Sequence, residues 1–270
     1  MAEASGRLVV CPTPIGNLED VTLRVLRALA EADVVACEDT RHTRKLLTRH
    51  GISDVELVSY HGHNEHRRAR ELVDRIRRGQ VVALVSDAGT PGVSDPGEVV
   101  VRASIEAGVP VDMLPGPSAA ITALIASGLP AVRWRFVGFL PRRATELRRE
   151  LEAAGGETVV AFESPRRVAA TLAALAELDP ERPVALCREL TKIHEEVVRG
   201  TARELADRFA DGTRGEVVLV VGPGAHSEEP DAGRAREAVE RLVEAGAKRR
   251  AAATVVAQLT GLSANDLYGR

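Results

Sequence analysis

The chain has 270 residues, of which 44% are hydrophobic and 28% charged, and its formal net charge at pH 7 is −3. This composition is typical of a globular protein with two domains or one large one, and it excludes a uniformly basic nucleic-acid coat protein. An RNA or DNA partner would have to bind local arginine patches. No run of 18 apolar residues occurs and the N-terminus has no long apolar stretch, so we predict a soluble, cytoplasmic protein without a membrane partner.

The cysteines and histidines do not predict a metal site. Cys11, Cys37 and Cys187 are far apart in the sequence and show no Cys-x-x-Cys or Cys/His ligand spacing. Three histidines lie within six residues, at positions 61, 63 and 66, a pattern more typical of a polar surface than of metal ligands. We therefore expect no metal partner.

Strand and helix patterns alternate through the first 127 residues. Short apolar runs predict strands at 7–11, 33–37, 55–60, 81–86 and 109–114. The stretches between and after them predict helices at 22–32, 40–50, 65–78, after Pro96, and at 118–127. Five consecutive β/α units imply a mostly parallel sheet covered by helices.

The pattern changes after Gly128-Leu129-Pro130. Further strands are predicted at 136–140, 158–162, 184–190, 194–200 and 216–222, with an Arg/Glu-rich helix between the first two and another helix after Pro165. The short spacing around Lys192 predicts a hairpin, so this second sheet should be mixed. Residues 222–233 have the composition of a linker, and helices at 234–246 and 248–258 and a turn at 263–268 follow. The fold class is thus α/β, with domains at 1–116 and 117–222 and a linker with a helical appendage at 223–270.

Four loops of the first half follow strands and are rich in Gly, Pro, Asn, Asp, His and Thr. They span 12–20, 37–43, 60–66 and 86–97. Because ligands bind at the carboxyl ends of parallel strands, we expect these loops to form a pocket together. No GxGxxG follows the first strand, and neither a P-loop nor a serine nucleophile elbow is present, so a dinucleotide site and a P-loop NTPase are not indicated.

Three aspartates in these loops have structural as well as functional interpretations. Asp39 and Asp95 each precede a predicted helix, and Asp95 stands directly before Pro96, which favours helix capping for Asp95. Asp87 follows a buried strand, where a lone carboxylate needs a partner, and that partner is either a ligand or the protein itself.

Arginines are concentrated in three places. The largest group comprises Arg133, Arg135, Arg142, Arg143, Arg148 and Arg149; a second is Arg41, Arg44 and Lys45; a third is Arg166 and Arg167. A solvated helix face would explain part of this excess. A surface that follows phosphates explains it better near Trp134 and Phe136, because arginine and aromatic side chains bind exposed nucleotides.

Eight motifs in order carry a family resemblance. They are TPIGNLEDVTLRVLRAL, EDTRHTRKLL, HNEHRR, VALVSDAGTPGVSDPG, LPGPSAAITALIASGLP, FVGFLPR, FESPRRV and CRELTKIHEEVVRG. Together, over residues 7–222, they resemble the tetrapyrrole-methylase superfamily, and within it the bacterial methyltransferases of small-subunit (16S) rRNA ribose. The resemblance implies two α/β domains with S-adenosylmethionine in the cleft between them, and a homodimer. It further implies 2′-O-methylation of a cytidine in the decoding region of the small ribosomal subunit.

The same resemblance implies cofactor-binding positions in both domains. These are Ile15, Gly16, Ser86, Asp87, Thr90, Ser118, Ala119, Phe162, Glu163 and Gly200. Ile15-Gly16-Asn17 stands where tetrapyrrole methylases have Pro-Gly-Asp, and this departure argues against a porphyrinoid substrate.

A ribose hydroxyl is a poor nucleophile, so a general base is expected. The candidates are Asp39, Glu38 and Glu163, and we favour Asp39 because Arg41 beside it could hold an RNA phosphate. The RNA-binding candidates are Arg41, Arg44, Arg142, Arg143, Arg166 and Arg167. Two alternatives remain: a methyltransferase of the same fold acting on a small tetrapyrrole-like molecule, and a non-catalytic ribosome-binding module. The C-terminal helices, with a basic turn at 248–250, are either an RNA-docking appendage or a dimer-stabilising tail.

Overall fold

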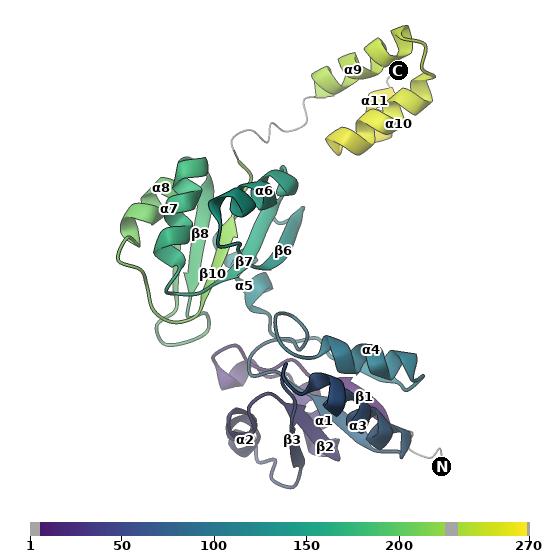
Figure 1. The fold of residues 1–270 in the computed structure, drawn as a ribbon, viewed down its shortest axis with the longest axis vertical. Coiled ribbons are helices and arrows are strands. Elements are labelled where there is room, and N and C mark those ends of the chain that lie inside the picture. Colours follow the sequence, from purple (N-terminus) through teal and green to yellow (C-terminus); the bar gives the residue numbers. More distant parts are fainter. Residues whose placement is uncertain (1–5, 225–231, 269–270) are drawn as a thin grey trace.

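The computed structural model describes residues 6–224 and 232–268. Figure 1 shows two α/β domains that follow each other along the chain, and a helical unit at the C-terminal end. Among the described residues, no helix is long and apolar enough to cross a membrane.

The first domain is built on a five-stranded sheet in the order β3-β2-β4-β1-β5. Its strands are β1 (Arg7–Val10), β2 (Val34–Cys37), β3 (Glu56–Ser59), β4 (Val81–Leu84) and β5 (Val111–Met113). Every pairing in this sheet is parallel. This confirms the parallel sheet that the alternating pattern predicts.

Helices cover both faces of this sheet. They are α1 (Leu23–Glu31), α2 (Thr40–Arg49), α3 (Glu65–Arg77) and α4 (Glu98–Glu106), with a short 3₁₀ turn, η1 (Leu18–Asp20), that the sequence did not indicate. Because successive strand side chains point to opposite faces, Val9 packs with α1 and α2, whereas Leu8 and Val10 pack with α3 and α4. The near-continuous apolar strands follow from burial on both faces.

The second domain has a five-stranded sheet in the order β6-β7-β10-β8-β9. Its strands are β6 (Trp134–Phe139), β7 (Thr158–Glu163), β8 (Pro183–Arg188), β9 (Glu196–Thr201) and β10 (Val217–Val221). Only β6 and β7 pair in parallel, and β8 and β9 form the antiparallel hairpin predicted around Lys192. The sheet is therefore mixed, as predicted.

One face of the second sheet packs against α6 (Ala144–Ala154), α7 (Val168–Leu178) and α8 (Ala202–Arg208). The other face packs against α5 (Ala119–Ser127), whose Ala120, Ala123 and Leu124 contact the strands. In sequence, α5 continues the β/α alternation of the first domain, yet in space it belongs to the second. The domain limits at 116 and 222 stay a prediction, to which this packing adds support.

The C-terminal unit consists of α9 (Ala232–Glu244), α10 (Arg249–Thr260) and α11 (Ala264–Tyr268). These helices bury a small core of their own around Val239, Val256 and Leu267. Arg133 links the unit to the second domain by donating a hydrogen bond to the carbonyl oxygen of Gly261 at 2.9 Å.

Candidate active site

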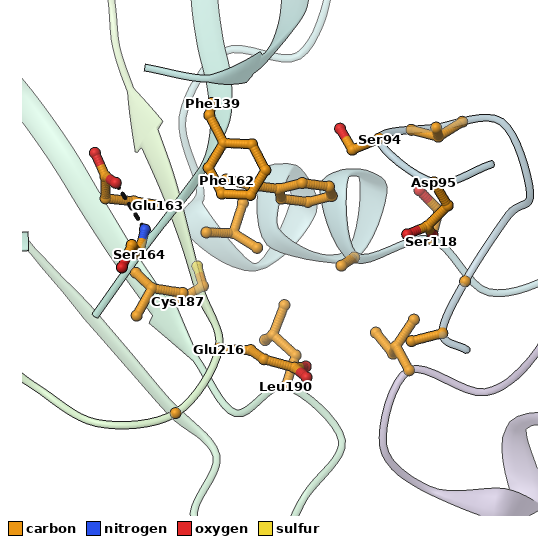
Figure 2. A pocket seen from close by; sticks show the side chains of 18 of the residues that line it. Ser94, Asp95, Ser118, Phe139, Phe162, Glu163, Ser164, Cys187, Leu190 and Glu216 are labelled. Carbon is orange, nitrogen blue, oxygen red and sulfur yellow. Dashed lines mark hydrogen bonds between the residues drawn. The ribbon is translucent and has the colours of Figure 1, made fainter. Parts of the chain in front are cut away.

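A cavity of about 460 Å³ lies between the two α/β domains (Figure 2). Its first-domain wall comes from the loops after β1 and β4, and the start of α5, which packs on the second sheet, adjoins them. Its second-domain wall comes from the ends of β6, β7 and β8 and the start of β10. The lining residues are Ile15, Ala88–Thr90, Val93–Asp95, Ser118, Ala119, Phe139, Phe162–Pro165, Cys187, Leu190 and Gly215–Val218.

The long loop after β4 forms much of the first-domain wall, and hydrogen bonds hold it in place. Thr13 and Gly89 exchange two main-chain hydrogen bonds of 2.8 and 3.0 Å, which join this loop to the loop after β1. Gly89 has φ +76°, a conformation that L side chains rarely adopt. Thr90 donates its hydroxyl to the carbonyl oxygen of Pro117 at 3.2 Å, which ties the same loop to the start of α5.

Six of the residues proposed to bind the cofactor line this cavity. They are Ile15, Thr90, Ser118, Ala119, Phe162 and Glu163. Phe162 contacts Phe136 edge-to-face, with the ring centroids 4.9 Å apart, so its ring orientation is fixed by packing.

Gly16, Ser86 and Asp87 lie outside the lining and support it instead. A side chain at Gly16 would meet Lys192 Cγ at 2.5 Å, so this glycine permits close contact between the domains. Ser86 is buried and donates its hydroxyl to the carbonyl oxygen of Gly89 at 3.1 Å. Asp87 accepts a 3.0 Å hydrogen bond from the main-chain N–H of Asp39, so its partner is the protein.

Gly200 requires a correction. It pairs with Val184 in the β8–β9 hairpin, at the opposite end of these strands from Cys187 and Leu190, which line the cavity. A side chain at Gly200 would instead meet Glu204 Oε2 at 2.7 Å. The structure therefore does not bring Gly200 to the candidate site.

Only two of the four predicted loops reach the cavity. The loops 12–20 and 86–97 contribute lining residues, whereas 37–43 and 60–66 contribute none. The reason is strand order: β1 and β4 are neighbours, and β2 and β3 extend the sheet to one side. The second domain closes over the carboxyl ends of β1 and β4.

Of the three predicted general bases, one lines the cavity and two lie outside it. Asp39 is the N-cap of α2 and accepts a 2.8 Å hydrogen bond from the N–H of Arg41, which lowers the pKa of this carboxyl group. Burial, and then the nearby charge of Asp87, raises the pKa of Glu38. Neither Asp39 nor Glu38 lines the cavity.

Glu163 lines the cavity, but its side chain is fully buried and both of its oxygens are engaged. Oε1 accepts from the N–H of Ser164 at 2.6 Å, and Oε2 accepts from the Thr171 hydroxyl at 2.7 Å. Arg167 Nη2 lies 3.2 Å from the same Oε2. This carboxylate organises the second-domain wall.

The prediction that Asp95 caps a helix is wrong. The N-cap of α4 is Gly97, and Asp95 lies two residues earlier, on the wall of the cavity. The sequence reasoning also missed Ser94, Phe139, Cys187 and Glu216 as lining residues. Ser94 and Asp95 belong to the loop 86–97, which was predicted to help form a pocket. Phe139, Cys187 and Glu216 belong to the second domain and reach the cavity because that domain packs on the first.

Burial raises the pKa of the Cys187 thiol to about 11, so this cavity-lining sulfur is protonated at neutral pH. Within residues 6–224 and 232–268, no group of three or more His, Cys, Asp and Glu side chains could hold a metal ion.

A second hollow of about 510 Å³ lies beside the cavity, between the start of α6 and the start of α7. Arg142, Arg166 and Arg167 line it, and Ser164 borders both hollows. Arg167 is held by Glu163 and by the carbonyl oxygen of Leu140 at 2.7 Å. Arg142 and Arg166 are exposed and form no ion pair with any described residue.

The remaining RNA candidates lie elsewhere. Arg143 pairs with Glu146 at 3.2 Å on the exposed side of α6. Arg41 and Arg44 are exposed on α2 of the first domain, and Arg41 lies 3.5 Å from Asp39.

Comparisons with known proteins agree with this architecture. The "Ribosomal RNA small subunit methyltransferase I" of Micromonospora olivasterospora is 47% identical over 270 residues, covering 98% of this chain and 86% of that protein. The protein of the same name from Mesorhizobium japonicum is 46% identical over 268 residues, covering 97% of this chain and 90% of that protein. A Thermus thermophilus uroporphyrin-III C-methyl transferase structure, complexed with S-adenyl homocysteine, has a TM-score of 0.57 at 25% identity, over 80% of this chain and 97% of that one.

These comparisons confirm the resemblance found in the motifs and the fold of two α/β domains. The family model for tetrapyrrole (corrin/porphyrin) methylases matches residues 7–206, which include every strand of the first sheet and all but one of the second. With that match, and with relatives of 46–47% identity along nearly the whole chain, this protein belongs to the tetrapyrrole methylase family.

Proposed function

We propose that this chain transfers a methyl group to the ribose 2′-oxygen of a cytidine in the decoding region of 16S rRNA. The methyl donor is S-adenosylmethionine. The names of the relatives support an rRNA substrate. The observation that carries the proposal is the arginine-lined hollow that shares Ser164 with the main cavity, because an RNA chain carries a negative charge on every phosphate and needs cationic side chains beyond the donor cavity.

The chemistry of the main cavity fits S-adenosylmethionine. The hydroxyl groups of Thr90 and Ser118 and the main chain of Gly89 would hold its polar ends, and Ile15 and Phe162 would contact the adenine. Of the residues that the structure describes, no lysine or arginine lines the cavity, whereas three carboxylates do, which suits a donor with a positively charged sulfonium. The bound donor supplies an electrophilic methyl group. The two walls hold donor and acceptor in line, and alignment can lower such a barrier by roughly 7–11 kcal/mol.

The candidate RNA-binding arginines differ in whether a carboxylate of the protein pairs with them. Arg142 and Arg166 carry unpaired charge beside the cavity and are the phosphate ligands that we propose. Arg167 and Arg143 are engaged by Glu163 and Glu146, so their contribution to RNA binding is smaller. Arg41 and Arg44 would meet a more distant part of the rRNA.

Phe139 supports an unstacked nucleotide as the substrate. It ends β6, three residues before Arg142, and its side chain is 55% exposed although it lines the main cavity. Its ring contacts Phe162 edge-to-face, with the centroids 6.0 Å apart, and leaves a surface open for a base. Single-stranded RNA bases stack on such rings.

We also propose that the protein acts as a homodimer in the cytoplasm, where its ribosomal substrate is assembled. Ile121 and Ile125 lie one turn apart on α5 and are 46% and 67% exposed, which suits contact with a second copy. Sedimentation of the purified protein tests this.

The C-terminal unit is not needed for the proposed site: in its basic turn, Arg249 pairs with both oxygens of Glu240, leaving Lys248 and Arg250 to meet RNA.

The direct test is tritium transfer from S-adenosylmethionine to purified small ribosomal subunits, followed by mass-spectrometric mapping of the methylated nucleotide. We expect one 2′-O-methylcytidine. Transfer to a tetrapyrrole and none to subunits would replace this function with the small-molecule alternative. Binding of subunits without any transfer would instead support the non-catalytic module.

A double variant, Arg142→Ala with Arg166→Ala, tests the role of the hollow. Two lost phosphate contacts should reduce the slope of log affinity against log salt by about 1.4–1.8, while the affinity for S-adenosylmethionine stays unchanged. The matched control is Arg148→Ala with Arg149→Ala, which removes two exposed arginines of α6 that do not line the hollow. Equal losses in both double variants would show that net charge, not the hollow, holds the RNA.

A further inference from the structure

The second hollow, between α6 and α7, has room for more than a phosphate group. Its volume of about 510 Å³ is no smaller than the 460 Å³ of the main cavity, whose chemistry fits the much larger S-adenosylmethionine. Ser164 lines both spaces, so they adjoin each other. An RNA whose target ribose meets the methyl donor at the main cavity therefore has its next nucleotide within reach of this hollow.

The inner wall of the hollow is apolar. Ala144 and Leu147 line it from α6, and Ala170 and Ala174 line it from α7. Because the three alanine side chains end at Cβ, they leave the space between the two helices open. Leu147 is buried in the core of the second domain and closes the hollow from below. These four side chains carry no polar atom that could bind a phosphate, whereas their carbon surface suits the flat face of a nucleobase.

The polar side chains of the hollow differ in whether the protein already engages them. Thr171 and Arg167 are both bonded to Glu163, so they belong to the wall. Arg142 and Arg166 are exposed, and neither forms an ion pair within the described part of the chain. An apolar interior beside two free cations complements both halves of a nucleotide, the base and the phosphate.

We propose that the hollow between α6 and α7 is a nucleobase subsite, which takes the base of the nucleotide next to the methylated cytidine while Arg142 and Arg166 hold the flanking phosphates. This rests on the proposed function. Ser164, whose hydroxyl forms no hydrogen bond with any described residue, is placed to bond the edge of that base. Phe139 and Ser164 lie on the same wall of the main cavity (Figure 2). With the target base against Phe139 and its neighbour in the hollow, the target ribose is held from two sides, which aligns its 2′-oxygen with the methyl group.

The test fills the hollow without changing the charge of the protein. The double variant Ala144→Leu with Ala170→Leu adds two larger apolar side chains at exposed positions that line it. The matched control is Ala153→Leu with Ala173→Leu, at exposed alanines of the same two helices that do not line the hollow. Because all four positions are exposed, both double variants should keep the urea midpoint of the wild type, and their S-adenosylmethionine affinity should stay within about twofold of it.

We expect the filled variant to lower the single-turnover methylation rate on small subunits by about tenfold to 100-fold, because a substrate displaced by about 1 Å loses that much rate. The control variant should methylate at the wild-type rate. The slope of log affinity against log salt should be unchanged in the filled variant, since Arg142 and Arg166 still meet their phosphates. This separates a base in the hollow from a phosphate, because the Arg142→Ala, Arg166→Ala variant lowers that slope.

A second measurement identifies the base. Small subunits are reconstituted with an abasic nucleotide on either the 5′ or the 3′ side of the target cytidine. The wild type should methylate one of the two about as slowly as the filled variant methylates normal subunits, and the filled variant should lose no further rate on it.

Three outcomes would overturn the subsite. They are a filled variant within about threefold of the wild-type rate on normal subunits, a filled variant with a lower salt slope, and a wild type insensitive to both abasic positions. If the wild-type protein transfers no methyl group to normal subunits, the proposed function itself fails, and that outcome is distinct from a failure of the hollow alone.

Discussion

The two walls of the cavity hold their acidic side chains in different ways. On the second-domain wall, Glu163 is fully buried and bonded to Ser164, Thr171 and Arg167. On the first-domain wall, Asp95 forms no hydrogen bond or ion pair within the described part of the chain and lies near three other acids. The contrast indicates a division of work: the strand ends give the cavity a fixed shape, and the loop after β4 carries a carboxylate that the protein itself does not neutralise.

Among the variants that test this contrast, replacing Glu163 should lower the free energy of unfolding most. Glu163→Ala leaves the partly buried Arg167 and the buried Thr171 hydroxyl without their partner, and breaking a buried pair costs about 3 kcal/mol or more. We expect a loss of that size in the free energy of unfolding, measured by urea denaturation.

Glu216→Ala is the matched variant on the same wall. Its ion pair with Lys192 is largely exposed, so the expected loss is below about 1 kcal/mol. Similar losses for Glu163→Ala and Glu216→Ala would contradict the view that Glu163 holds the wall together.

The second prediction concerns the effect of the Asp95 carboxylate on the free energy of unfolding. The folded-state pKa of Asp95, about 6, lies above the ordinary aspartate value of about 3.9, so ionised Asp95 disfavours folding above pH 6. Asp95→Asn should therefore raise the free energy of unfolding at pH 8 by up to about 2 kcal/mol. The gain should shrink to about 0.5 kcal/mol or less near pH 4, where the folded chain is protonated and the unfolded chain about half protonated at this position.

Urea denaturation of wild type and Asp95→Asn at pH 8 and pH 4 measures this difference, with Glu98→Gln as the control for a lost surface charge. A destabilised Asp95→Asn at pH 8 would mean that the carboxylate supports the loop. A stabilised variant with reduced methyl transfer would be the trade-off expected of a functional group held in an unfavourable position.

The two aspartates that precede helices show what could be read from the sequence and what could not. The strand–helix alternation, the parallel sheet and the Lys192 hairpin follow from local patterns, and the structure confirms them. Which aspartate faces the cavity depends instead on where the second domain docks on the first. Asp39 follows β2, away from that contact, and Asp95 lies in the loop after β4, within it. Motif spacing carries no information about such a long-range contact.

Replacing Asp39 should have the smallest effect on stability and on methyl transfer. Asp39 caps α2 through a hydrogen bond from the N–H of Arg41, and a serine at the same position can accept that bond while an alanine cannot. Asp39→Ala should therefore lower the urea midpoint slightly, and Asp39→Ser should restore most of the loss. Both variants lack the carboxylate, and both should methylate small subunits within about threefold of the wild-type rate, because Asp39 lies outside the cavity. A loss of about 100-fold in Asp39→Ser, with its stability intact, would show that Asp39 acts in methyl transfer as the general base.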